Sequence, residues 1–296
     1  DVESGSSLAE ALRRHPKTFN DLFTNLVEVG ETGGILDTVL QRLSAYIEKA
    51  AALKAKVKSA MMYPTAIVSV AFLVIVFMLT FIIPTFAKMF TQMGAELPMP
   101  TKIVVGASNL MLSYWWLRGG VGAGGIFGLR AYYKTGAGKL VIDSLVLKVP
   151  VMGMLIRKVS VARFTRTLGT LISSGVPILE GLRITARTAG NQVVENAVMA
   201  TREVVSAGGV LVEPLKASGV FPPMVTQMIN VGEQTGALDT MLGKIADFYD
   251  EEVDTAVGGL MALLEPMMIV FLGVSIGGLV VAMYLPIFKL VTVMGK

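Results

Sequence analysis

The chain has no cysteine and a single histidine among its 296 residues. Without cysteine it can form no disulfide, no thiolate nucleophile and no cysteine-ligated metal site. The one histidine, His15, lies in a polar, basic stretch. Because one isolated imidazole makes neither a catalytic triad nor a zinc site, we expect His15 to be solvated. These two scarcities exclude thiol chemistry and metal sites built from histidine pairs.

Motifs for catalysis and cofactor binding are also missing. Gly120, Gly122 and Gly125 have the spacing of a dinucleotide-binding loop, but they lie in an apolar run with no strand before them. Gly138-Lys139 lacks the earlier glycine of a phosphate-binding loop. No serine in an apolar run has a histidine or lysine partner for nucleophilic chemistry. We therefore expect no catalytic residue, no cofactor and no metal, and a protein that is not an enzyme.

Charged residues are scarce, at 16% of the chain, whereas hydrophobic residues make up 53%. This balance is typical of a membrane protein with sizeable polar portions. Residues 59–87 carry no formal charge and exceed the roughly 20 residues that a spanning helix needs. We predict further spans at 113–133, where Arg118 interrupts the apolar stretch, and at 261–288. The chain should therefore cross the membrane three times.

The lysines and arginines predict the orientation of these spans. Lysines crowd the approach to the first span, and Arg130, Lys134 and Lys139 lie at the end of the second span and just after it. By the positive-inside rule the larger regions face the cytosol, and acidic residues before the third span count little. The predicted divisions outside the spans are a partial first cytosolic domain (1–58), a periplasmic loop (88–112), a second cytosolic domain (134–260) and a periplasmic tail (289–296).

A long internal repeat is the most informative feature that is present. The element Gly-Glu-x-x-Gly-x-Leu-Asp-Thr begins at Gly30 and again at Gly232, an offset of 202, and the same offset relates Pro64 to Pro266. One inserted residue brings Leu8 into register with Leu211. Such a repeat predicts one structural unit used twice. Because the helical pattern around residues 163–182 has no counterpart in the first copy, we expect the natural protein to extend upstream.

The glycines of this element have a structural interpretation. We expect Gly30 and Gly232 to end a helix by adopting a left-handed backbone conformation. Gly34 and Gly236 then permit a tight turn before the next helix.

The aspartates and the glutamates of the same element have different expected roles. Asp37 and Asp239 fall in the first turn of the following helix, where they suit the helix dipole. Glu31 and Glu233 either cap backbone donors within the chain or face a partner. Both roles remain open at this point.

Apolar residues in the polar regions recur with the period of a helix and not of a strand. Leu36, Leu40, Leu43 and Ile47 follow one helix face, and the second copy repeats the stripe. No alternating pattern of useful length occurs. We therefore predict an all-α membrane protein with two related cytosolic helical bundles, the first of them truncated.

Small residues at four-residue spacing mark two of the predicted spans. Gly120, Gly124 and Gly128 form one ridge, and Gly273 and Gly277 form another. Such ridges allow helices to approach closely, either within the chain or in a dimer.

Charged residues near the spans are candidate contacts with partners. Glu265 is the one carboxylate close to the hydrocarbon, and it is either an intramembrane functional group or a residue of the cytosolic interface. The other candidates either contact a partner or meet anionic lipid and solvent. They are Lys54, Lys56 and Lys58 before the first span, and Asp250, Glu251 and Glu252 before the third.

Taken together, several motifs resemble the type II secretion F domain family, the inner-membrane platform proteins of type IV pilus and type II secretion machines. The resemblance covers nearly the whole chain. It is carried by the stretch from Phe164 to Leu182, by Leu147-Lys148-Val149-Pro150, by the two Gly-Glu-x-x-Gly elements, by Tyr63-Pro64 and by Glu265-Pro266.

The resemblance implies a non-enzymatic scaffold with three spans and two related six-helix cytosolic bundles. It also implies a set of partners. These are a hexameric cytosolic assembly or retraction ATPase, pilins or pseudopilins, inner-membrane alignment proteins, membrane lipid and a second copy of the chain in a homodimer, but no nucleic acid. A pilus system is preferred, although the shared motifs do not separate it from a secretion system.

Two other function classes fit less well. A transporter with internal repeats usually has broken helices and polar residues at mid-membrane, and here the predicted spans are nearly free of them. A membrane hydrolase needs an intramembrane catalytic pair, which the sequence lacks. Flux across liposomes would favour the first class, and activity abolished by one point mutation in a span would favour the second.

Overall fold

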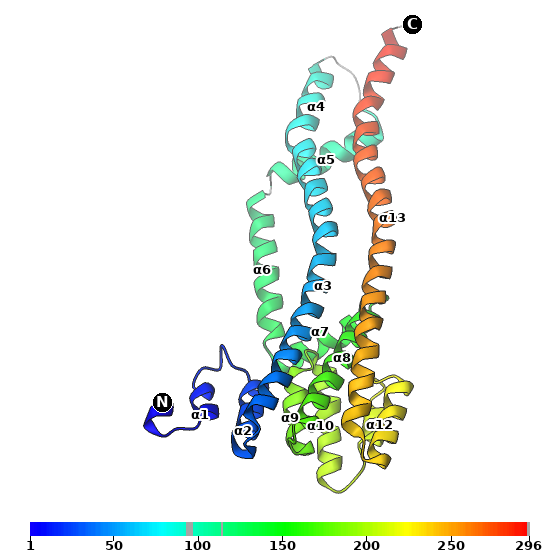
Figure 1. Cartoon of the computed structure of the whole chain (residues 1–296). Helices are drawn as coiled ribbons and strands as arrows, with labels where there is room; N and C mark the ends of the chain where they lie inside the picture. The colour runs from blue at the N-terminus through cyan, green and yellow to red at the C-terminus, as the bar shows by residue number, and fades with distance from the viewer. Residues whose placement is uncertain (93–96, 114, 295–296) are drawn as a thin grey trace. The chain divides into compact units, whose positions relative to one another are not determined.

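The computed structural model describes residues 1–92, 97–113 and 115–294 (Figure 1). Within them every regular element is a helix and no strand occurs, which confirms the all-α prediction. Short 3-10 and π-helical turns occupy Val2–Ser4 and Met78–Ile82. The α-helices are α1 (Leu8–Arg13), α2 (Asp21–Gly33), α3 (Leu36–Phe77), α4 (Ile83–Gln92), α5 (Met99–Ser113), α6 (Trp115–Tyr133), α7 (Gly136–Lys148), α8 (Met152–Ser173), α9 (Ile178–Thr188), α10 (Gln192–Ser206), α11 (Val212–Ala217), α12 (Pro223–Thr235) and α13 (Leu238–Met294).

The helices form two compact units. Unit 1 comprises residues 1–57 and 133–258, and unit 2 comprises residues 58–132 and 259–296. The long helices α3 and α13 each begin in unit 1 and continue into unit 2. Below, residues 1–57 are called the first-copy segment and residues 133–258 the second-copy bundle.

The main core of unit 1 lies inside the second-copy bundle. Buried side chains of α8 pack there against α9, α10, α12 and the start of α13. The rings of Phe164 and Phe221 have centroids 4.8 Å apart. Gly169 brings α8 close to α13, because a Cβ at this position would lie 3.2 Å from the Cβ of Leu242. The motif Phe-x-x-x-Leu-Gly of α8 is thus a packing motif.

A second core joins the first-copy segment to the bundle. Leu22 and Leu26 of α2 and Leu43 of α3 are buried against Leu171 of α8 and Ile184 of α9. Burial of an aliphatic side chain is worth about 1.5–3 kcal/mol, so this cluster is a large part of what holds the segment in unit 1.

Unit 2 is built from the apolar parts of the long helices together with α4, α5 and α6. Met78, Ile83 and Leu279 form its core, with Val104 and Val105 of α5 packed against them. The Thr101 hydroxyl donates to the Ala282 carbonyl oxygen over 2.6 Å. Residues 88–112, predicted as a connecting loop, therefore contain most of a helix that packs within the unit.

Two helical stretches in the described residues are long and apolar enough to cross a membrane. They are Leu36–Gln92 and Leu238–Phe288, and they contain the predicted spans at 59–87 and 261–288. The predicted span at 113–133 coincides with α6. The side chain of Arg118 in it lies outside the described ones. This middle span stays a prediction.

The glycine ridges have no close neighbour among the described residues. A Cβ on Gly120, Gly124, Gly128, Gly273 or Gly277 would meet no described atom within 4 Å outside its own helix backbone. Intrachain packing at the ridges is thus not seen among the described residues. Their role in a dimer stays a prediction.

Candidate interface between the repeat copies

The sequence repeat corresponds to a repeat of three helices, with α1, α2 and α3 in the first copy and α11, α12 and α13 in the second. Both bounds of α12 lie 202 positions after those of α2, and α13 begins 202 positions after α3. Gly34 and Gly236 end α2 and α12 in the left-handed conformation, with φ of 68° and 70°. That conformation favours glycine, so the turn predicted at these two positions is confirmed.

The prediction for the other two glycines is wrong. Gly30 and Gly232 do not end helices; they lie buried inside α2 and α12. A Cβ on Gly232 would lie 2.9 Å from the Cα of Leu238, and one on Gly30 would lie 3.1 Å from the Cα of Leu36. Each glycine therefore lets its helix approach the first turn of the next one. The helices end three residues later, at Gly33 and Thr235, because the glycine that follows each end supplies the left-handed residue.

The glutamates of the repeated element cap backbone donors within the chain. Glu31 accepts hydrogen bonds from the backbone N–H of Leu8 at 2.9 Å and of Ala9 at 3.3 Å. Glu233 accepts from the backbone N–H of Leu211 at 2.9 Å. These donors stand at the starts of α1 and α11, where helices leave N–H groups unsatisfied. Each glutamate thus ties a short helix to the longer helix that follows it.

We expect Glu233→Ala to weaken this tie by about 1 kcal/mol, because the substitution leaves the Leu211 N–H without its carboxylate acceptor. Hydrogen exchange of the full chain should become faster at the start of α11. Glu203→Ala, which removes an exposed carboxylate from α10, is the matched control. Equal protection at α11 in the two variants would contradict the assignment.

Asp37 and Asp239 fall in the first turns of α3 and α13, as predicted. There a carboxylate interacts favourably with the positive end of the helix dipole.

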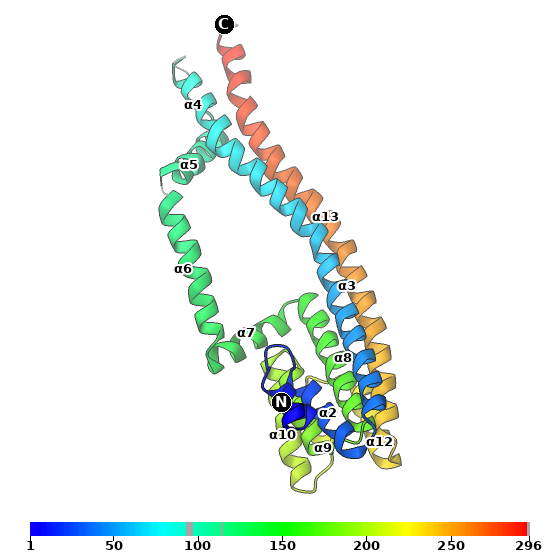
Figure 2. The same ribbon diagram turned by 60° about the vertical axis from the view of Figure 1, so that its left-hand side comes forward.

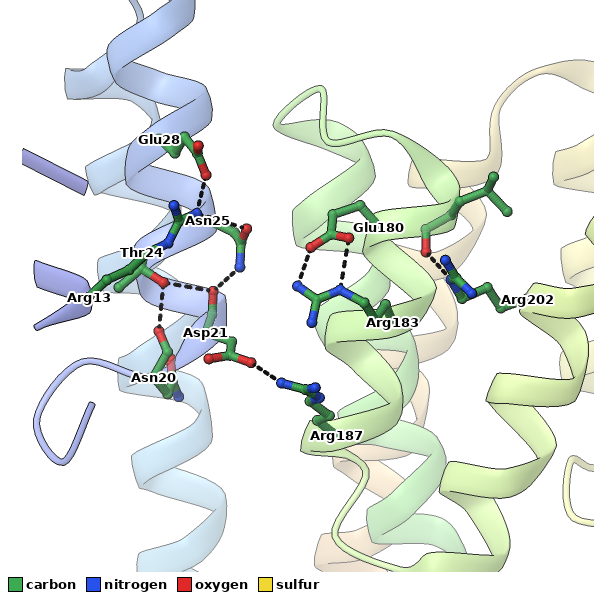
Figure 3. Close-up of polar contacts among 11 residues, drawn as sticks. Arg13, Asn20, Asp21, Thr24, Asn25, Glu28, Glu180, Arg183, Arg187 and Arg202 are labelled. Atoms are coloured by element: carbon green, nitrogen blue, oxygen red, sulfur yellow. Dashed lines mark hydrogen bonds and ion pairs between the residues drawn. The ribbon is translucent and has the colours of Figure 1, made fainter. Parts of the chain in front are cut away.

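Exposed polar contacts join α2 to α9. The Arg187 guanidinium donates to the Asp21 carboxylate over 2.6 Å (Figure 3). On the same face of α9, Arg183 pairs with Glu180, and that hydrogen bond lowers the pKa of the Glu180 carboxyl. The Asp21–Arg187 pair is more than half exposed on the Arg187 side, so it contributes little stability beside the apolar core under it.

A charged cluster joins α3, α8 and α13. Arg166 of α8 donates to Asp247 at 2.7 Å and to Asp250 at 2.6 Å. Lys49 of α3 donates to the same Asp247 at 2.9 Å. Asp247 therefore receives hydrogen bonds from both repeat copies. Figure 2 shows the unit 1 parts of α3 and α13 running beside α8. We call Lys49, Arg166, Asp247 and Asp250 the α3–α8–α13 cluster.

Two further ion pairs extend the contact along the helices. Lys56 pairs with Asp254, seven residues beyond the Lys49–Asp247 pair on both helices. A seven-residue spacing keeps side chains on one seam of two parallel helices. Lys158 of α8 donates to Glu252 over 2.6 Å. The sequence signal for this pairing is the seven-residue spacing of Lys49 and Lys56 in one copy and of Asp247 and Asp254 in the other, but three of these four residues were not among the predicted contacts.

The contacts of the cluster shift the pKa values of Asp247 and Arg166. Burial acts to raise the pKa of the Asp247 carboxyl, but hydrogen bonds from Lys49 and Arg166 outweigh burial and the net pKa is lowered. For Arg166, burial acts to lower the pKa, and the bonds to Asp247 and Asp250 raise it overall. Asp247 and Arg166 are therefore both charged at neutral pH, and each charge stabilises the other.

The structure places the charged candidates predicted from the sequence in two groups. Lys56, Asp250 and Glu252 are engaged in the intrachain pairs just described. Lys54, Lys58 and Glu251 are exposed and form no hydrogen bond or ion pair with the part of the chain that the structure describes. Glu265 is exposed on α13 beside Pro266. Only the unpaired group is free to meet another molecule without first breaking an intrachain bond.

The described residues contain no group of three histidine, cysteine, aspartate or glutamate side chains that could hold a metal ion. The contacts between the two repeat copies that the structure shows include apolar packing and ion pairs.

Comparison with known proteins gives a consistent set of similarities. The chain matches the family described as type II secretion system (T2SS), protein F, over residues 1–84 and 164–286. It is 50% identical to the type IV pilus assembly protein PilC of Myxococcus xanthus, over 98% of this chain and 69% of the relative. It is 45% identical to TapC, a type IV pilus assembly protein of Aeromonas hydrophila, over 100% of this chain and 72% of the relative. It is 33% identical to the type II secretion system protein F of Pseudomonas aeruginosa, over 99% of this chain and 73% of the relative.

Proposed function

Since the chain belongs to the type II secretion system protein F family, we propose that it is a non-enzymatic platform protein for type IV pilus biogenesis. The observation that carries the pilus assignment is the order of similarity. Four relatives named for type IV pilus assembly are 43–50% identical to the chain, whereas relatives named as secretion protein F are 33–35% identical. A platform for pseudopilins in a type II secretion system is the second candidate.

In this proposal the protein lies in the bacterial inner membrane with three spans. The two apolar helical stretches and the family support that location. Unit 1 faces the cytosol, where it meets the assembly or retraction ATPase. Pilins, inner-membrane alignment proteins, lipid and a second copy of the chain are its other partners.

The proposed mechanism is transfer of work from the cytosol to pilins in the membrane. Extraction of an apolar pilin helix from lipid exposes surface at a cost of about 25 cal/mol per Å², so energy must come from outside the membrane. The shared core and the α3–α8–α13 cluster hold α3 and α13 together in unit 1. Both helices continue into the apolar segments. A displacement applied to unit 1 would therefore act on two spans at once.

Co-purification tests this proposal. The tagged full chain, solubilised from cells that make pili, should bring an assembly or retraction ATPase and pilins with it. Recovery of a secretion ATPase and pseudopilins would assign the chain to a type II secretion system. Recovery of neither would reopen the transporter class, which liposome flux can check.

The unpaired lysines provide a sharper test of the partner surface. The double variant Lys54→Glu, Lys58→Glu should lower surface piliation severalfold, because it reverses two exposed charges that are not used within the described chain. Shed pili and the amount of platform protein in the membrane are measured together. Lys17→Glu, an exposed reversal in the loop before α2, is the control. Normal piliation in the double variant would contradict a partner role for these lysines.

A further inference from the structure

A recess between α3 and α8 is lined by three cationic side chains. Its volume is about 380 Å³, and Arg42, Tyr46, Lys49, Arg166, Thr170 and Ser173 line it. Arg42 and Lys49 come from the first-copy segment, and Arg166 comes from the second-copy bundle. The volume falls in the range of small-molecule sites, which begins near roughly 300 Å³.

The charges around this recess do not balance. Asp247 and Asp250 both pair with Arg166, and Asp247 also pairs with Lys49. Arg42 donates to the backbone carbonyl of Ser173, and no described carboxylate lies within ion-pair distance of it. Three cations thus face two carboxylates, so the recess keeps a surplus positive charge.

The hydrogen-bonding capacity of the recess is also incomplete. The Nε of Arg166 is buried and has no hydrogen-bond partner among the described residues. The hydroxyls of Thr170 and Ser173 already donate to backbone carbonyls, at 2.8 Å and 3.1 Å. The free donors are therefore those of the guanidinium and ammonium groups. A ligand for this recess must supply acceptors and negative charge.

These requirements match a phosphate group. A phosphate monoester carries about −1.5 to −2 charges and three strong acceptor oxygens, and guanidinium groups bind such oxygens bidentately. A single carboxylate would offer only two oxygens to three convergent cations.

The repeat shows that the recess is not a by-product of the duplicated fold. At the positions equivalent to Arg42, Tyr46 and Lys49, the second copy has Lys244, Phe248 and Glu251. The second copy keeps an aromatic ring, Phe248, but this ring has no hydroxyl. Glu251 replaces the cation Lys49 with an acid. The two cations and the hydroxyl that α3 contributes to the recess are therefore not repeated on α13.

We propose that this recess binds a phosphate-bearing ligand, which bridges the first-copy segment to the second-copy bundle. Contacts with Arg42 and Lys49 on one side and Arg166 on the other would tighten the joint between α3 and α8. The ligand would thereby stiffen the connection between the repeat copies, and its loss would loosen it.

Calorimetric titration of pyrophosphate into the full chain, in an uncharged detergent and a buffer without phosphate, tests the site. We expect saturable binding that Arg42→Gln weakens about tenfold, since one charge-assisted contact is removed. Lys49→Gln should weaken it similarly. Lys244→Gln removes the same charge at the equivalent, exposed position of α13 and should bind like the unmodified chain.

Discs of neutral lipid, with or without phosphatidic acid, distinguish the source of the phosphate. Binding of pyrophosphate indicates a soluble ligand. If only phosphatidic acid binds, with the same loss in Arg42→Gln, the phosphate belongs to a lipid headgroup. Absence of binding by both probes, or an equal loss in Lys244→Gln, would overturn the proposal.

Discussion

Arg166→Met is expected to destabilise unit 1 by about 2–3 kcal/mol, because it leaves two carboxylates without their shared cation. The Arg166 side chain is only 16% exposed, whereas Asp250 is 33% and Asp247 is 62% exposed. The exposure of Asp247 keeps the expected loss below that of a fully buried pair. Thermal unfolding of the full chain in detergent, with limited proteolysis to locate the loosened segment, measures the effect.

Two further variants test whether the loss of stability comes from breaking the cluster and not from removing an arginine as such. Arg187→Met removes an exposed guanidinium, 60% accessible, whose partner Asp21 is half exposed, and should cost under about 1 kcal/mol. Arg166→Lys keeps the charge but loses the planar fork, so an intermediate loss is expected. If Arg166→Met melts like Arg187→Met, the pairs of Arg166 with Asp247 and Asp250 do not stabilise unit 1.

Gly232→Ala is expected to destabilise unit 1 by about 1–3 kcal/mol, because the nearest atom to the added Cβ belongs to the backbone and cannot rotate away. It would lie 2.9 Å from the Cα of Leu238 and 3.1 Å from the Cβ of Met241. Relief requires that α12 and α13 move apart, which disturbs the core of the second-copy bundle. Thermal unfolding of the full chain measures the loss.

Gly243→Ala is the matched control, since a Cβ at that position of α13 meets no described atom within 4 Å. There the change should stabilise the helix by about 0.5–1 kcal/mol. Gly30→Ala should resemble Gly232→Ala with a smaller loss, because its Cβ has slightly more room, at 3.1 Å from the Cα of Leu36. Equal stability of the Gly232 and Gly243 variants would contradict the close crossing of α12 and α13.

In the repeated glycine element, the sequence predicts the role of one pair of glycines and not that of the other. Its spacing predicted the turn at Gly34 and Gly236, because the need for positive φ is a local property. It misassigned Gly30 and Gly232, whose role depends on a neighbouring helix. A glycine that ends a helix and one that permits a crossing look the same in a sequence, so only the packing of α2 on α3 and α12 on α13 separates them.

The pairing of the charged residues likewise depends on the tertiary structure. The sequence identified Lys56, Asp250 and Glu252 as candidates for partners, and the structure pairs each of them within the chain. Arg166 and Asp247, the centre of the cluster, were not among the candidates, because partners far apart in the chain carry no local signal. The cationic recess beside Arg42 was missed for the same reason.

By itself, then, the sequence determined the helical class, the apolar stretches and the internal repeat. These follow from hydrophobic periodicity, run length and self-similarity, which are local or additive properties. Only the tertiary structure decided that the first-copy segment packs on the second-copy bundle and that Asp247 receives hydrogen bonds from both. Those contacts depend on which helix faces meet, and many pairings of the same faces would satisfy the sequence pattern equally well.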